Sequence, residues 1–160
     1  MFTGVHHFRK DVARDASRPI VLFCSRIERE HRRQGGAVKD GYNLERRVAD
    51  FAARCLDVCE ALPRGRVGVA NFKDQLSRSA TAVAANYAEA SVPASRRDFA
   101  NKMSIAMKEL VESRMWLYII AKREYIKSSL LIPLSDEADE LVRIFNASIT
   151  TARKRLNADT

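Results

Sequence analysis

Four series of apolar residues, each repeating at steps of three and four, occupy most of the chain, and prolines and glycines separate them. This spacing puts apolar side chains on one face of an α-helix, whereas a half-buried strand alternates apolar and polar residues. Val, Ile and Thr alternate with polar residues over no useful length. The chain has 160 residues, 46% of them apolar, which suffices for one domain with a real core. The pattern predicts an all-α fold.

Capping residues and helix breakers set the expected bounds of the helices. Asn43 is a plausible N-cap for the first helix, and Ser95 with Asp98 forms a capping-box pattern before the third. Pro133 is expected to open the fourth. The expected helices are residues 44–62, 69–90, 95–125 and 133–155. Because their connections are short, we expect an antiparallel up-and-down four-helix bundle.

Residues 1–42 differ from the rest of the chain, since they contain all three histidines and show no sustained helical period. The segment 25–34 could form a short helix, but it has no broad apolar face to hold it in place. We therefore expect an N-terminal extension, poorly ordered or a short helix, followed by a bundle domain at residues 43–157.

The cellular location follows from what the chain lacks. Its longest uninterrupted apolar run is Met115 to Ala121, far shorter than the roughly 20 residues needed to cross a bilayer. The N-terminus does not have the pattern of a signal peptide. Three cysteines do not resemble a disulfide framework. We expect a cytoplasmic protein without a membrane contact.

Positive charge points to polyanionic partners, because 28 Lys and Arg against 20 Asp and Glu leave a net charge of +8. In an up-and-down bundle, cations from the first, third and fourth helices should gather at one end, and the other end should be net negative. A surface of that kind binds phosphate backbones with little sequence preference. A merely solvated charged end is the alternative. The predicted nucleic-acid-binding residues are Arg46, Arg47, Arg96, Arg97, Lys102, Arg153, Lys154 and Arg155.

Residues 75–90, "QLSRSATAVAANYAEA", set polar residues among small ones. If the second and third helices form an antiparallel hairpin, Arg78 should lie beside Glu109, and Asn86 beside Asn101. The small residues would let the two helices approach closely. The alternative is a catalytic pocket, but no histidine or exposed nucleophile stands at a matching level. The predicted structural polar network is Arg78, Asn86, Glu89, Asn101 and Glu109.

Cys55 and Cys59 lie one helical turn apart, a spacing that could present two thiolates to zinc. The remaining ligands would have to come from the N-terminal extension, from Cys24 or His31. Cysteines on an apolar stripe usually pack as small hydrophobic residues, so we favour core packing and expect neither metal nor cofactor.

The apolar run of residues 115–121 surrounds its helix on all sides, so a single bundle interior cannot bury it completely. Trp116, Tyr118 and Ile119 are therefore predicted to form a subunit interface, where large aromatic side chains are common. In the alternative, a monomer, residues 19–24 cover this face.

Four consecutive blocks carry a family resemblance: residues 51–63, 75–90, 95–117 and 137–145. In order and spacing they resemble the four-helix-bundle 23S rRNA intervening-sequence proteins. The resemblance implies a homo-pentamer without established enzyme activity. It also implies remote kinship with the accessory protein of diversity-generating retroelements, which binds nucleic acid and a reverse transcriptase. The chain departs from many relatives at Arg46 and Arg47, where an apolar and aromatic pair is common, and at Ala90, where Gly is frequent.

Two functions remain open after these observations. The first is a non-enzymatic, homo-oligomeric bundle that binds RNA or DNA, associated with rRNA or auxiliary to a reverse transcriptase. The second is a homo-oligomeric scaffold that binds a protein partner without nucleic acid. An enzyme is disfavoured, because the sequence has no phosphate-binding loop, dinucleotide turn or helix with paired metal ligands.

Overall fold

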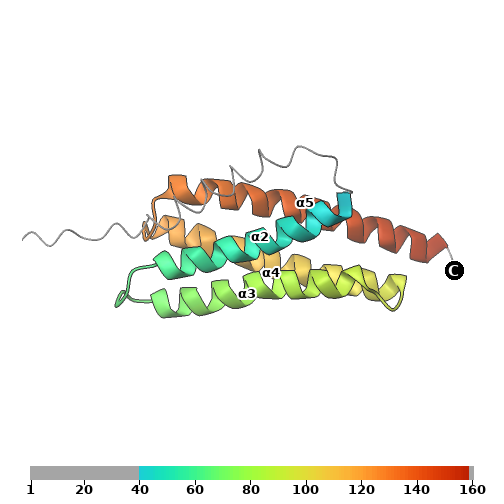
Figure 1. Ribbon diagram of the computed structural model, residues 1–160, viewed down its shortest axis with the longest axis horizontal. Helices are drawn as coiled ribbons and strands as arrows, with labels where there is room; N and C mark the ends of the chain where they lie inside the picture. Colours follow the sequence, from blue (N-terminus) through green and yellow to red (C-terminus); the bar gives the residue numbers. More distant parts are fainter. Residues whose placement is uncertain (1–39, 159–160) are drawn as a thin grey trace, which may run out of the picture.

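The structure, a computed structural model, describes residues 40–158, and these residues form four helices without a strand. The helices alternate in direction along one long axis, so that each runs antiparallel to the one before it (Figure 1). The predicted all-α up-and-down four-helix bundle is therefore confirmed. Most of the expected N-terminal extension lies outside the described residues. The helices are α2 (Asp40–Ala61), α3 (Val69–Ser91), α4 (Arg96–Lys122) and α5 (Ser128–Ala158).

Two helices begin earlier than the sequence suggested. Asn43 is not an N-cap, because α2 already begins at Asp40 and passes through Gly41, whose cost of about 1 kcal/mol does not stop a helix. Pro133 lies inside α5 rather than opening it. Proline removes one backbone donor there, and the burial of Leu131 and Leu134 on either side keeps this first part of α5 in the bundle.

The predicted cap of α4 is present, since the Ser95 side chain accepts a hydrogen bond from the Asp98 backbone N–H at 3.1 Å. The other end of α4 stops at Lys122, three residues before the expected Tyr125. Glu124 has a φ of 53°, and the Tyr125 N–H bonds back to the Ile120 carbonyl, which is the pattern of a Schellman motif.

The core runs the length of the bundle between the four helices. α3 packs against both α2 and α4, and α4 packs against α5, and among these neighbouring pairs the contact between α2 and α5 is the smallest. The seam between α2 and α5 is therefore the most open side of the bundle. The largest fully buried side chains are Phe51, Leu76, Met103, Leu110, Leu117, Ile120, Leu131, Leu141 and Phe145.

Within residues 40–158, no helix combines the length and the apolar character that a membrane span requires. Each helix instead has one buried face and one charged face.

Candidate nucleic-acid interface

The start of α4 and the end of α5 lie at the same end of the bundle (Figure 1). Arg96 and Arg97 open α4, and residues 153–155 occupy the last turns of α5. All five of these side chains are exposed. The antiparallel topology therefore brings together cations that are far apart in the sequence, and we call Arg96, Arg97, Arg153, Lys154 and Arg155 the basic end.

A cleft of about 510 Å³ lies between these two helices. Arg96 contributes one wall from α4 and Arg155 the other from α5, and Phe99 provides an apolar surface between them. Ser148 and Thr151 add hydroxyl groups from α5. Two guanidinium groups beside hydroxyls suit a phosphate group, because guanidinium can donate two hydrogen bonds to it. The complete lining is Pro93, Arg96, Phe99, Ala147, Ser148, Thr151, Ala152 and Arg155.

Lys102 and Arg153, which we assigned to this surface, have partners within the protein. Lys102 forms an ion pair with Glu89 across α3 and α4, and this hydrogen bond raises the pKa of the Lys102 ammonium. Arg153 donates from Nη2 to the Ser104 hydroxyl, 3.2 Å away on α4. Both side chains therefore have internal partners that a phosphate would have to displace or share.

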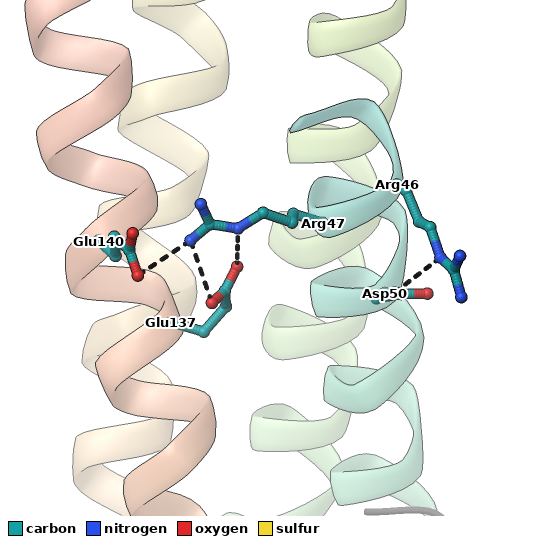
Figure 2. Close-up of polar contacts among 5 residues, drawn as sticks. All are labelled: Arg46, Arg47, Asp50, Glu137 and Glu140. Atoms are coloured by element: carbon teal, nitrogen blue, oxygen red, sulfur yellow. Dashed lines mark hydrogen bonds and ion pairs between the residues drawn. The ribbon is translucent and has the colours of Figure 1, made fainter. Parts of the chain in front are cut away.

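Arg47 does not belong to the basic end. Its Nε and Nη2 donate to the two carboxylate oxygens of Glu137 at 2.9 and 3.2 Å, and Nη2 also lies 3.1 Å from Glu140 (Figure 2). These acidic residues lie on α5, so Arg47 closes the open seam between α2 and α5. The hydrogen bonds that Arg47 donates to Glu137 raise the Arg47 pKa against the effect of burial. Its charge is already balanced, which argues against a direct role in phosphate binding.

Arg46 extends on the other side of α2, where its Nε lies 3.7 Å from Asp50 one turn later (Figure 2). About 38% of the Arg46 side chain is exposed, compared with 20% for Arg47. The two neighbouring arginines thus have different environments, and Arg46 is the more exposed of the two.

Several of the acidic residues that we expected to make the opposite end negative form ion pairs with arginines of α2 and α4. Glu137 and Glu140 pair with Arg47, and Asp139 pairs with Arg114 of α4. These pairs neutralise charge along the length of the bundle, not at its tip. Three of the acidic residues that we counted at the opposite end, Glu137, Asp139 and Glu140, are therefore neutralised along the bundle.

The predicted polar network in residues 75–90 has different partners in the structure. Arg78 is not beside Glu109: its side chain is 72% exposed, and Nη1 lies 3.8 Å from Asp74 on the same helix. The Asn86 side chain donates from Nδ2 to the backbone carbonyl oxygen of Ala82 at 2.8 Å. Its predicted partner, Asn101, is exposed. The Arg78–Glu109 and Asn86–Asn101 pairs are therefore wrong predictions.

The actual ties between α3 and α4 are the Glu89–Lys102 ion pair and a hydrogen bond between two buried serines, Ser79 and Ser113. In both pairs the α4 residue lies four or five positions later than the predicted register requires. Side chains tilt toward the N-terminus of their own helix, away from the connecting loop on α3 and toward it on α4. A residue of α3 therefore meets a later residue of α4 than a count of backbone positions suggests.

The model of the 23S rRNA-intervening sequence protein family matches residues 43–147. The chain belongs to this family. As a member of the 23S rRNA-intervening sequence proteins, it shares all of α3 and α4 with the family pattern, and most of α2 and α5. The resemblance inferred from the four sequence blocks is confirmed. The match ends before Arg153, Lys154 and Arg155, so three of the five residues of the basic end lie beyond it.

A solved structure supports the same assignment. It is the 1.70 Å crystal structure of a protein with unknown function from the S23 ribosomal protein family of Bacteroides thetaiotaomicron VPI-5482. The two chains are 28% identical, with a TM-score of 0.60, and the similarity covers 66% of this chain and 97% of that one. No curated protein matches the chain.

The predicted interface residues of this 23S rRNA-intervening sequence protein do not share one face. Trp116 is half-buried and packs on Phe72 of α3, with ring centroids 5.9 Å apart, and its indole donates to Glu112. Tyr118 is 57% exposed and Ile119 is partly buried. The sequence missed Val111 and Met115, which are exposed and lie on the same side of α4 as Tyr118. The spacing of positions 111, 115 and 118, four and three residues apart, could have shown in the sequence that these apolar residues share one helix face.

Both described cysteines are buried in the core. Burial raises the pKa of the Cys55 thiol, and it raises the pKa of Cys59 to about 11. The Cys59 thiol donates to the Lys73 carbonyl at 3.6 Å. Within the described part of the chain, no group of three or more His, Cys, Asp or Glu residues could hold a metal ion. Cys24 and His31, the other expected ligands, lie outside it.

Proposed function

We propose that the protein is a non-enzymatic RNA-binding bundle that contacts the phosphate backbone through the basic end. The observation that carries this proposal is the cleft that holds Arg96 and Arg155 on opposite walls. Arg97 and Lys154 are exposed and extend the positive surface beyond the cleft. The name of the family refers to 23S rRNA, which makes RNA the preferred ligand.

The contact is electrostatic in origin. Lys and Arg side chains that neutralise phosphates release condensed counterions, so binding is strong at low salt and carries little sequence information. Phe99 adds an apolar surface inside the cleft, against which one base or sugar can rest. A single aromatic residue does not form a stacking platform, so we expect shape and charge, rather than sequence, to decide the ligand.

We propose no catalytic role for the polar residues of α3 and α4. Arg78 is exposed on the outside of α3, Asn86 bonds to its own helix, and Glu89 pairs with Lys102. Glu109 is partly buried on α4, and the contacts of the other three side chains do not involve it. The four side chains therefore do not converge on a common point where a substrate could react.

Fluorescence anisotropy with a labelled structured RNA tests the RNA-binding proposal. Affinity should fall at least about tenfold between roughly 50 and 200 mM salt. The double variant Arg96→Glu/Arg155→Glu should lose most of the remaining binding, while Arg78→Glu, which reverses an exposed charge on α3, should retain it. Equal effects of the two charge reversals, or an affinity that does not respond to salt, would contradict the proposal.

The exposed apolar side chains of α4 favour self-association, and we propose that a second copy of the chain covers Val111, Met115 and Tyr118. The exposed fraction is 54% for Met115 and 57% for Tyr118, high values for large apolar side chains on a helix. A homo-pentamer and a reverse transcriptase partner remain expectations that rest on the family resemblance alone.

Light scattering tests the assembly. Met115→Glu should reduce the particle mass, whereas Glu112→Gln, on the neighbouring exposed position, should not. If both variants keep the wild-type mass, this face is not the interface. A protein that assembles but binds no RNA at any salt concentration would favour the scaffold function instead.

A further inference from the structure

The end of the bundle opposite the basic end carries a second cleft of about 430 Å³. It lies at the connection between α2 and α3 and extends onto the first turns of α3. Three cations line it, Arg64 and Arg66 from the connection and Lys73 from α3, and no acidic residue does. Pro63, Val67 and Val69 supply apolar surface beside them.

The two connections at this tip are net positive, whereas the sequence-based expectation for this end of the bundle was a net negative charge. The two connections at this tip, residues 62–68 and 123–127, contain Arg64, Arg66, Arg123 and Lys127 against a single acid, Glu124. The acidic residues early in α5 that were expected to offset these cations are paired farther along the bundle. The two connections therefore carry a net positive charge, while Asp57, Glu60 and Asp74 lie on the adjoining turns of α2 and α3.

Tyr125 holds part of this cationic surface in place. The Arg66 guanidinium carbon lies 5.2 Å from the centre of the Tyr125 ring, and that of Arg123 lies 5.6 Å from it. The Tyr125 hydroxyl donates to the Val67 carbonyl at 3.1 Å, which ties the connection between α4 and α5 to the connection between α2 and α3. Cation–π contacts fix an arginine without neutralising its charge. Arg66 is therefore held in position beside the cleft with its charge retained.

We propose that this second cleft, the turn-end cleft, binds the terminal phosphate of an RNA strand. A terminal phosphate monoester carries close to two negative charges, whereas a phosphodiester within the strand carries one, and three cations in one small cleft match the former better. The apolar side formed by Pro63, Val67 and Val69 suits the terminal sugar or base. This inference rests on the proposed RNA-binding function and adds an end-specific contact to it.

The first turn of α3 strengthens the match. No acidic residue occupies it, and no side chain caps its backbone N–H groups. The positive end of the α3 dipole therefore adds to the field of Arg64, Arg66 and Lys73 at the cleft. Gly68 precedes this helix with a φ of 81°, a backbone conformation that residues with a side chain rarely adopt. Glycine therefore permits the sharp turn by which the connection enters α3 beside the cleft.

The test compares one single-stranded RNA with a 5′-monophosphate and the same RNA with a 5′-hydroxyl, both carrying the label at the 3′ end. The wild-type protein should bind the monophosphate RNA about tenfold more tightly. Arg64→Gln/Lys73→Gln should bring that ratio close to one. Lys108→Gln, which removes an exposed charge on α4 away from the cleft, should leave it unchanged. Arg66 is not substituted in this variant, because its contact with Tyr125 also supports the fold.

The outcomes separate the two proposals. If the wild-type protein binds the monophosphate RNA and the hydroxyl RNA equally well, the terminal-phosphate site is overturned. Binding of both RNAs that depends on Arg155 would then still support the basic end. Monophosphate-specific binding that depends on Arg64 and Lys73 but not on Arg155 supports the turn-end cleft and overturns the basic end. Inorganic pyrophosphate should compete with the monophosphate RNA and not with the hydroxyl RNA; equal competition against both contradicts the site.

Discussion

The Ser113 hydroxyl of α4 donates a hydrogen bond to the Ser79 hydroxyl of α3, 2.8 Å away in the core of the bundle. Ser113 is completely buried and Ser79 is 2% exposed. Ser79 in turn bonds to the Leu76 carbonyl at 3.4 Å, so both polar groups are satisfied. This pair, and not Arg78, marks the centre of the contact between α3 and α4.

For the serine pair, we expect the small size of the two side chains to contribute more to stability than the hydrogen bond between them. Ser79→Ala/Ser113→Ala should change the free energy of unfolding by less than about 1 kcal/mol, because both partners are removed together. Ser79→Leu should cost about 1 to 3 kcal/mol, because the extra atoms force the helices apart. Denaturant unfolding measures both values. A double alanine variant as unstable as the leucine variant would show that the hydrogen bond is the dominant contribution.

Arg47 is predicted to stabilise the α2–α5 seam. Arg47→Gln should lower the free energy of unfolding by about 1.5 to 3 kcal/mol, because it removes a two-point, largely shielded contact with Glu137. Arg78→Gln is the control. Its single exposed pair with Asp74 on the same helix predicts a change below about 0.5 kcal/mol. Thermal or chemical unfolding showing equal losses in the two variants would contradict this difference.

Asp57 predicts a dependence of stability on pH. Its Oδ2 is buried without a hydrogen-bond partner among the described residues, and burial, with Glu60 nearby, raises its pKa from 3.8. The folded state therefore holds this proton more tightly than the unfolded chain, and the contribution of Asp57 to stability falls as the pH rises from about 4 through the raised pKa.

Asp57→Ala should therefore stabilise the protein at pH 7 by about 1 kcal/mol, and the gain should shrink toward pH 3. Glu45→Ala is the matched control, because it removes an exposed carboxylate from the same helix about three turns away from Asp57. Urea unfolding at several pH values gives both curves. A gain for Asp57→Ala that stays constant from pH 3 to 7 would exclude the unpaired carboxylate as its source.

Glu124 predicts a stabilising substitution at the end of α4. It occupies the left-handed position of the Schellman motif, where its φ of 53° strains any residue with a Cβ atom. Glu124→Gly should raise the stability by about 1 kcal/mol. Glu124→Ala removes the charge but keeps the strain, so it should give no such gain. A higher melting temperature in the alanine variant than in the glycine variant would assign the effect to charge.

The sequence predicted the helices well and their partners poorly. The stripes through Phe51, Leu76, Leu110 and Phe145 match the buried faces, because burial alternates with the helical period whatever the neighbours are. Residues such as Arg78 and Asn86 were assigned cross-helix partners from the register of the hairpin. That register also depends on the tilt of side chains, which a count along the chain does not include.

The same limit applies to charge. The sequence identified Arg96 and Arg155 as members of one end, since an up-and-down topology requires it, and the structure places both in one cleft. It did not reveal that Arg47 is paired with Glu137, nor that the turn-end cleft is positive. Those features depend on where acidic residues of α5 lie relative to α2 and α4 along the axis.

The fold class, the number of helices and the family are thus properties of the local pattern, because a three-to-four spacing and its breaks constrain each helix independently. Which charges remain available to a ligand was decided by the packing of one helix against another. An ion pair forms only when two side chains reach the same level on facing surfaces, and that level is set by the fit of the whole bundle.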